Sequence, residues 1–174
     1  MNKFIKKFYW ILIVFLIIGL DQITKHLIVS KLELYEEIAI IPNFFTITHV
    51  HNEGIAFGML SKFGALSKIA VILLTFVMIV VAVLLIIKHL VTGSLGIVCV
   101  SFIIGGGIGN LIDRVVLRYV VDFFAFTFWG KDFAIFNVAD IFVTVGTILF
   151  MFYFLFLQKD EPLLKGKDDG NQKL

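Results

Sequence analysis

The chain has 174 residues, of which 60% are hydrophobic and 15% aromatic, and its mean hydropathy is +1.02. This apolar share is far above that of a soluble domain and predicts an integral membrane protein. The formal net charge is only +2 and the lysines lie mainly near the ends of apolar segments, which excludes a basic face for nucleic acid. The single cysteine, Cys99, can form no intramolecular disulfide and is interpreted as a small packing residue.

Four segments are long and apolar enough to cross a bilayer, which requires about 20 mostly apolar residues. They cover residues 8 to about 29, 66–87, 95–111 and 133–157. The first follows three lysines, as a signal peptide would, but no small-residue cleavage site follows it, so we interpret it as a retained anchor helix. Residues 1–157 are therefore expected to form one membrane-embedded domain, and the polar, charged segment 158–174 a disordered cytoplasmic tail.

The distribution of basic residues predicts the orientation in the membrane. An even number of spans places both termini on one side, together with three lysines before the first span, Lys88 and four lysines in the tail. The opposite loops hold six basic residues: Lys31, Lys62, Lys68, Arg114, Arg118 and Lys131. By the positive-inside rule we expect both termini in the cytoplasm.

Two loops then lie on the extracytoplasmic side. In the first loop, residues 30–62, the segment 45–50 alternates in the period-two pattern of a strand, and residues 52–54 follow as a turn. This pattern predicts a small sheet at the membrane surface. The second loop, residues 113–132, carries the aromatic residues Phe128 and Trp129 and is expected to lie along the interface.

Polar residues collect toward the outer ends of the spans. Residues at i, i+3 and i+4 share a helix face, so the polar residues of each span form a small cluster, and all three clusters lie at one depth. The members are Asp21 and Lys25 in the first span, Asn110, Asp113 and Arg114 at the end of the third, and Asn137 and Asp140 in the fourth. We expect them to line a partly wet pocket.

The positions of Asp122 and Asp140 in apolar surroundings are harder to explain without a chemical role than those of the other acids. Asp122 lies between two valines and two phenylalanines, and Asp140 lies in an apolar helix, where a central acid costs about 2.5–3.5 kcal/mol. Two carboxylates close together in a low-dielectric site do not both ionise readily. Such a pair can activate water, because the anionic acid takes a proton from water while the protonated one polarises a carbonyl.

Other polar features have alternative interpretations. Asp21 with Lys25 fits a neutralising ion pair that helps the helix insert as well as it fits a direct chemical role. The four glycines at positions 105, 106, 107 and 109 are interpreted as a helix-packing surface, because no strand precedes them as in a phosphate-binding loop.

Three residues at and just after the end of the predicted strand could bind a metal. His49, His51 and Glu53 lie on one strand face, but no clear third and fourth ligand accompanies the histidines. A surface role is therefore favoured, and we expect no metal and no cofactor to take part in the chemistry.

Five motifs together resemble a known family. They are DQITK at 21–25, NEGIAFG at 52–58, GGGIGNLIDR at 105–114, VVDFF at 120–124 and FNVAD at 136–140. Their order and spacing resemble those of the lipoprotein signal peptidases, the signal peptidase II family, over about residues 8–157.

The resemblance implies an aspartic endopeptidase of the bacterial cell membrane. Such an enzyme removes signal peptides from prolipoproteins, cutting just before the cysteine that carries a diacylglyceryl group, and is inhibited by globomycin. Asp122 and Asp140 match the family's catalytic pair. The matching polar residues around the site are Asn52, Asn110, Arg114 and Asn137, and those that support fold and activity are Asp21, Lys25 and Asp113. The implied fold is α-helical, with four transmembrane helices, an extracytoplasmic β-cradle and a short interfacial helix.

Two other function classes fit part of the pattern. A small proton- or ion-coupled transporter would use Asp21, Lys25 and Asp140 as a relay, but its acids should be spread across the bilayer depth. The inner halves of the second and third spans contain no acid. A non-enzymatic membrane scaffold would not need two acids in separate motifs.

Overall fold

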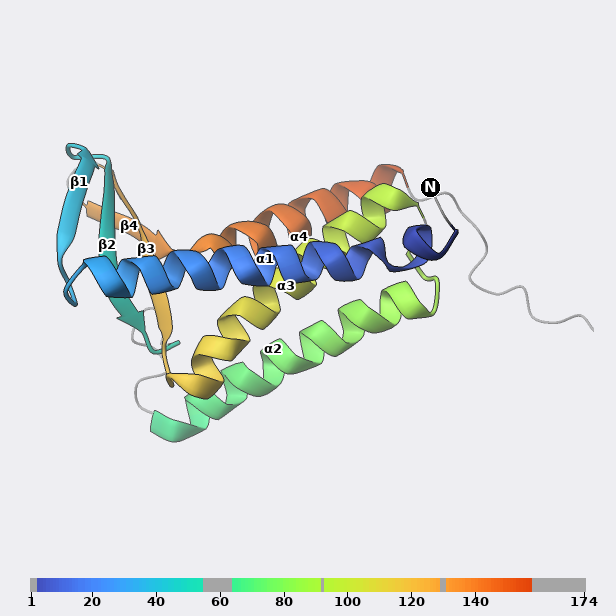
Figure 1. Cartoon of the computed structure of the whole chain (residues 1–174), viewed down its shortest axis with the longest axis horizontal. Coiled ribbons are helices and arrows are strands. Elements are labelled where there is room, and N and C mark those ends of the chain that lie inside the picture. Colours follow the sequence, from blue (N-terminus) through green and yellow to red (C-terminus); the bar gives the residue numbers. More distant parts are fainter. Residues whose placement is uncertain (1–2, 55–63, 92, 129–130, 158–174) are drawn as a thin grey trace, which may run out of the picture.

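The computed structural model describes residues 3–54, 64–91, 93–128 and 131–157, which form four long helices and a four-stranded sheet across one end of them (Figure 1). In chain order the elements are α1 (Lys3–Lys31), β1 (Glu37–Ile41), β2 (Phe45–Asn52), α2 (Gly64–Ile87), α3 (Ser94–Val116), β3 (Val120–Phe128), β4 (Lys131–Phe136) and α4 (Val138–Phe156). All four helices are long and apolar enough to cross a membrane. The predicted multi-pass membrane protein with a small sheet is confirmed.

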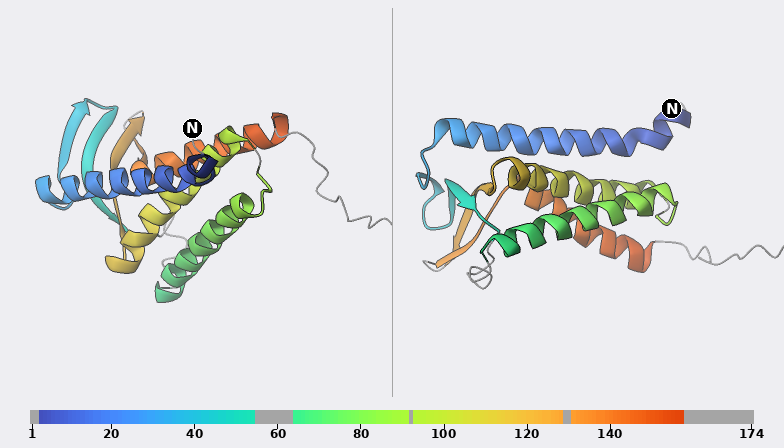
Figure 2. Two further views of the ribbon diagram at one scale, coloured as in Figure 1. Left: turned by 45° about the vertical axis from the view of Figure 1, so that its right-hand side comes forward. Right: turned by 90° about the horizontal axis from the view of Figure 1, so that it is seen from below.

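Helix α3 lies at the centre of the bundle and packs against the other three helices (Figure 2). In the most apolar stretch of 18 residues in α3, 56% of the residues are buried inside the protein, against 17–22% in the same stretch of the other three spans. Its glycines make this possible: a Cβ added at Gly105 would lie 2.9 Å from Ile17 of α1, and one at Gly106 would overlap the carbonyl oxygen of Ala139 in α4. A Cβ added at Gly107 would lie 3.2 Å from the side chain of Ile79 in α2. The helix-packing interpretation of the glycines is therefore confirmed.

The sheet is antiparallel with the strand order β1-β2-β3-β4. The alternation at residues 45–50 correctly predicted β2, which is an inner strand between β1 and β3. In the pairing of β2 with β3, Val50 lies opposite Asp122, and an irregularity in the register precedes this pair. The sheet thus holds Asp122 at the end of the bundle where α4 begins (Figure 1).

The second of the two loops that were expected on the extracytoplasmic side differs from the prediction. Helix α3 continues to Val116, and the chain then forms β3 and β4 instead of a segment lying along the interface. Strand β4 also covers residues 133–136, predicted as the start of the fourth span, so α4 begins only at Val138. These apolar residues are in the sheet because they pair with β3, for example Phe124 with Phe136.

The implied interfacial helix is not among the described elements, whose α-helical residues all belong to α1–α4. Residues 55–63, which include part of the NEGIAFG motif, lie outside the described residues, as does Trp129. Residues 158–174, predicted as a tail, also lie outside them.

Candidate active site

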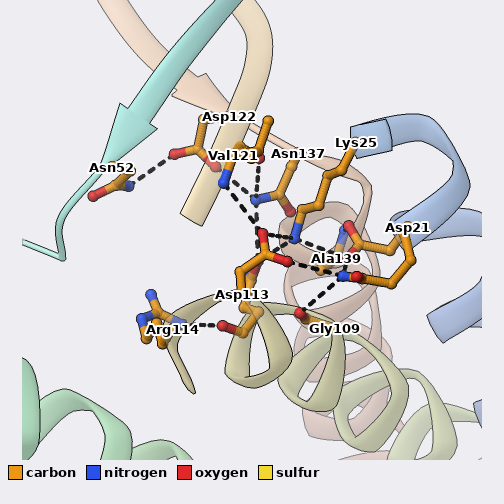
Figure 3. Close-up of polar contacts among 12 residues, drawn as sticks. Asp21, Lys25, Asn52, Gly109, Asp113, Arg114, Val121, Asp122, Asn137 and Ala139 are labelled. Carbon is orange, nitrogen blue, oxygen red and sulfur yellow. Dashed lines mark hydrogen bonds and ion pairs between the residues drawn. The ribbon is translucent and has the colours of Figure 1, made fainter. Parts of the chain in front are cut away.

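Asp122 is buried in the middle of the site, with 2% of its surface exposed. Strand β3 provides it, and the end of β2 provides Asn52, whose Nδ2 donates a 2.8 Å hydrogen bond to Oδ2 of Asp122. The other carboxylate oxygen, Oδ1, accepts a 2.6 Å hydrogen bond from Nδ2 of Asn137. Both oxygens of this acid are therefore held by amides from neighbouring elements (Figure 3).

Asn137 and Asp140 are fixed by the way α4 begins. Asn137 is the N-cap residue of α4, and its Oδ1 accepts the backbone N–H of Asp140 at 3.0 Å. In return, Oδ2 of Asp140 accepts the backbone N–H of Asn137 at 3.2 Å, which completes a capping box. The FNVAD motif thus has a structural basis in this helix cap, and the cap places Asp140 in the first turn of the helix.

A second amide joins Asp140 to the rest of the site. Nδ2 of Asn110, from α3, donates to Oδ1 of Asp140 at 2.7 Å. Oδ1 of Asn110 accepts from Nδ2 of Asn137 at 3.1 Å. Asp122 and Asp140 are thus connected through two side-chain amides in the order Asp122, Asn137, Asn110, Asp140.

Lys25 forms a buried ion-pair cluster behind these amides. Its Nζ lies 2.8 Å from Asp21 and 3.0 Å from Asp113, and donates a 2.9 Å hydrogen bond to Oδ1 of Asn110. All three charged side chains are almost completely buried. Among the described residues, no hydrogen bond or ion pair joins Asp21 or Lys25 to Asp122 or Asp140. The contacts thus favour a supporting role for this pair over a direct chemical one.

The two acids of this cluster also bind backbone groups. Oδ1 of Asp21 accepts the N–H of Ala139 at 2.9 Å, and Oδ2 of Asp113 accepts the N–H of Val121 at 3.2 Å. The cluster therefore connects α1, α3, β3 and α4.

Gln22 belongs to the site but was not predicted as a site residue. Its Nε2 lies 3.0 Å from Oδ1 of Asp113 and 3.3 Å from the carbonyl oxygen of Gly109. The available signal was its position beside Asp21, as a second polar residue in an apolar span. Gly109 itself has no room for a side chain, because an added Cβ would lie 2.6 Å from Oδ2 of Asp21.

Arg114 lies at the edge of the site (Figure 3). Its Nη1 donates a 3.3 Å hydrogen bond to the carbonyl oxygen of Asn110, and its buried Nε has no partner among the described residues. All nine residues proposed from the sequence therefore lie in one connected region at the sheet end of the bundle.

The histidines and Glu53 each have separate partners. His49 is buried, with Nδ1 3.1 Å from the carbonyl oxygen of Leu32, so the predicted surface role is wrong for this residue. The ring of His51 stacks on Tyr119 at a centroid distance of 3.6 Å, and Glu53 pairs with Lys68 at 2.7 Å. Within the described parts of the chain, no three His, Cys, Asp or Glu side chains are arranged to hold a metal ion.

Burial changes the acidity of Asp122. Loss of solvation raises its pKa from the ordinary 3.8 to about 6, and the nearby charge of Asp140 acts in the same direction. The hydrogen bonds from Asn52 and Asn137 oppose this shift, because they stabilise the carboxylate. Asp122 can therefore exchange a proton near neutral pH, as a general acid or base must.

Known proteins resemble this chain in both sequence and fold. The family model of signal peptidase (SPase) II matches residues 13–156. The lipoprotein signal peptidase of Clostridioides difficile (strain 630) is 41% identical over 149 residues, which are 86% of this chain and 96% of that protein. That of Streptococcus pneumoniae (strain ATCC BAA-255 / R6) is 39% identical over 139 residues, 80% of this chain and 87% of that protein.

A solved structure described as a bacterial membrane enzyme, determined by the in meso method at 1.9 Å resolution, has the same fold. Its TM-score is 0.75 at 33% sequence identity, and the match covers 86% of this chain and 94% of that one. The family match spans the four helices and the sheet that together hold the buried acids. The chain therefore belongs to the signal peptidase II family and is a membrane peptidase.

Proposed function

We propose that this chain is an aspartic endopeptidase that removes the signal peptide from diacylglyceryl-modified bacterial prolipoproteins, cutting just before the lipidated cysteine. The observation that carries the proposal is the connection of Asp122 and Asp140 through the amides of Asn137 and Asn110. The lipoprotein signal peptidases among its relatives support the choice of substrate.

The acids take different roles in the proposed reaction. Asp140 is half-buried, and as the carboxylate it removes a proton from a water molecule, whose oxygen attacks the scissile carbonyl carbon. Asp122, with a pKa of about 6, donates its proton to the carbonyl oxygen. When the tetrahedral intermediate collapses, the C–N bond breaks and the proton held by Asp140 passes to the departing amine. The carbonyl hydroxyl returns its proton to Asp122, and neither acid is consumed.

The site lies at a shallow depth. Asp140 is the third residue of α4, so at 1.5 Å per residue it lies about 3 Å along the helix axis from the first residue of the span. With cytoplasmic termini, as the distribution of lysines favours, this end of the bundle faces the outer leaflet. A substrate held by acyl chains in that leaflet would present its modified cysteine near this depth.

The aromatic side chains of the sheet offer an apolar surface for those acyl chains. Phe124 and Phe126 are half-buried on β3 and contact Phe45 at centroid distances of 6.0 and 4.9 Å. Phe123, between Asp122 and Phe124 on the same strand, is only 2% exposed and belongs to the packed interior instead. Globomycin-like inhibitors would compete for the same surface and acids.

The test is cleavage of a diacylglyceryl-modified prolipoprotein peptide by the purified protein in detergent. Asp122→Asn and Asp140→Asn should each remove activity while circular dichroism shows an unchanged helix content, because an amide cannot exchange the proton. The double variant should lose no more than either single one, because the acids act as a unit. Glu37→Gln, an exposed acid on β1, is the matched control and should retain full activity.

A second comparison tests the role of the lipid. Unlipidated precursor should be cut far more slowly at subsaturating substrate, because the binding energy of the acyl chains no longer positions the scissile bond. Robust turnover by Asp140→Asn would contradict the assignment of the acids, whereas equal rates on both precursors would contradict the role of the lipid.

A further inference from the structure

A pocket of about 170 Å³ lies beside the acids, between the end of β2, the start of α2 and the end of α3. Three of its lining residues are cationic, Lys68, Arg114 and Arg118, and one is acidic, Glu53. The rest of the wall is aliphatic and comes from α2 at positions 69, 71 and 72. Neither candidate catalytic acid lines it.

The charged residues leave this pocket with a net charge of +2, from three cations and one acid. Glu53 pairs with Lys68 at 2.7 Å, but both side chains are well exposed, at 55% and 37%, so an incoming anion can replace the carboxylate. Arg118 is exposed, and within the described part of the chain its side chain makes no ion pair or hydrogen bond. The buried Nε–H of Arg114 has no hydrogen-bond acceptor among the described groups.

The backbone holds Arg118 at the pocket in an unusual conformation. Its φ is 76°, in the left-handed region that residues other than glycine rarely adopt. Its N–H donates to the carbonyl oxygen of Asp113 at 3.2 Å, just after the last turn of α3. A strained position of this kind is often found where a side chain binds a ligand.

The aliphatic wall lies on the outer surface of a membrane span. Ile69 is 53% exposed, Val71 and Ile72 are half-buried, and α3 is the helix against which α2 mainly packs. A ligand in this pocket would therefore contact cations at the end of the span and hydrocarbon along its side. Neither a free anion nor a polar peptide would use both surfaces.

We propose that this pocket binds an anionic phospholipid, with the phosphate between Lys68 and Arg118 and an acyl chain along the aliphatic wall of α2. Arginine suits this role because its planar guanidinium can bind two phosphate oxygens at once. Arg114, at the edge of the candidate active site, also lines the pocket. The lipid would be a second ligand, separate from the prolipoprotein, so its binding can be measured without any cleavage reaction.

The experiment is a titration of the purified, detergent-solubilised protein with phosphatidylglycerol, with retained lipid measured by native mass spectrometry. Phosphatidylcholine, which has the same chains and no net charge, is the comparison lipid. Phosphatidylglycerol should bind at least ten-fold more tightly, and Lys68→Gln and Arg118→Gln should each weaken its binding about five-fold. Lys31→Gln, an exposed cation at the end of α1, is the matched control and should bind like the unmodified protein.

Glu53→Gln adds a test that misfolding cannot imitate. Removing the competing carboxylate should tighten phosphatidylglycerol binding about five-fold, because Lys68 becomes free for the phosphate. The proposal is overturned if Lys68→Gln and Arg118→Gln bind this lipid like the unmodified protein, or if phosphatidylcholine binds equally well. It is also overturned if inorganic phosphate at the same concentration displaces the lipid, since the pocket would then be a site for free phosphate.

Discussion

Asp21 accepts the backbone N–H of Ala139 and Asp113 accepts that of Val121, so each of these buried acids holds the residue directly before one of the proposed catalytic acids. Lys25 lies between them, 2.8 and 3.0 Å from their carboxylates. One cation therefore supports the backbone at both Asp122 and Asp140. This explains why residues far apart in the chain form a single region.

Lys25→Met should lower stability strongly, because it leaves two buried carboxylates without a cation. Breaking a buried ion pair in this way costs about 3–5 kcal/mol. Adding Asp113→Asn to Lys25→Met should recover part of the loss by removing one of the unpaired charges. Thermal unfolding in detergent measures both effects, with the exposed Lys31→Met on the same helix as the control. If Lys25→Met and Lys31→Met unfold at the same temperature, the ion-pair cluster is not a structural support.

Substitutions of Asn137 should separate its two roles, the cap of α4 and the amide donor to Asp122. Asn137→Ala loses both, and the missing cap should cost about 0.5–2 kcal/mol. Asn137→Ser keeps a good, uncharged N-cap but loses the amide donor to Asp122, so activity should fall at least 100-fold with a smaller loss of stability than in Asn137→Ala. Cleavage rates and melting temperatures of the two variants test this. An active Asn137→Ser enzyme would show that the 2.6 Å bond to Asp122 is dispensable.

The raised pKa of Asp122 predicts a pH-dependent stability. Because its folded value of about 6 lies above the ordinary 3.8, folding favours the protonated acid. The corresponding stability, about 3 kcal/mol, is fully present below pH 3.8 and is lost as the pH rises through about 6. The melting temperature of Asp122→Asn should therefore rise relative to that of the unmodified protein between pH 4 and pH 7.5. A difference that stays constant over this range would show that Asp122 titrates normally.

Gly106 should tolerate no side chain, because a Cβ there would overlap the carbonyl oxygen of Ala139 and lie 2.8 Å from Val143. Gly106→Ala is expected to push the first turn of α4 away from α3, at a cost of about 1–3 kcal/mol, and to lower activity through Asp140. Gly107→Ala is the matched control, since it meets only the side chains of Met78 and Ile79, at 3.2 Å. Equal melting temperatures and cleavage rates for both variants would contradict this packing argument.

Chelation by EDTA should leave cleavage intact, because the proposed reaction uses only the two acids and water. The measurement is the rate on lipidated precursor before and after dialysis against EDTA, with zinc added back to a portion. Activity that disappears and returns with zinc would contradict the prediction and would favour His49 and His51 as zinc ligands.

The sequence predicted the helices better than the sheet. The second span was placed within two residues of the start of α2 and ends with it at Ile87, because the run from Ile69 to Ile87 contains no charged residue. Strand β3 was predicted as a loop segment along the interface and most of β4 as the start of the fourth span, and only pairing such as Phe126 with Ala134 reveals them as strands. That pairing is a tertiary contact, which a local pattern does not contain.

The composition of the site could be predicted, but its connections could not. The three acids inside the described spans are Asp21, Asp113 and Asp140, and they lie together near the sheet. The i, i+3, i+4 spacing of the polar residues predicted this clustering. A transporter relay would instead spread its acids across the bilayer. The sequence could not show that Gln22 joins α1 to α3, or that His49 is buried against Leu32. Both contacts depend on how α1 lies against its neighbours.

The capping of α4 constrains how the protein matures in the membrane. The first turn of α4 obtains hydrogen-bond partners from Asp21 in the first span and Asn110 in the third, while Asn137 reaches back to β3. A nascent chain that ends after β3 already contains Asp122 and Asn110 but lacks both Asn137, which joins them, and Asp140 itself. The two acids can therefore meet only after the last helix has been inserted and packed, which keeps a partly synthesised chain inactive during biogenesis.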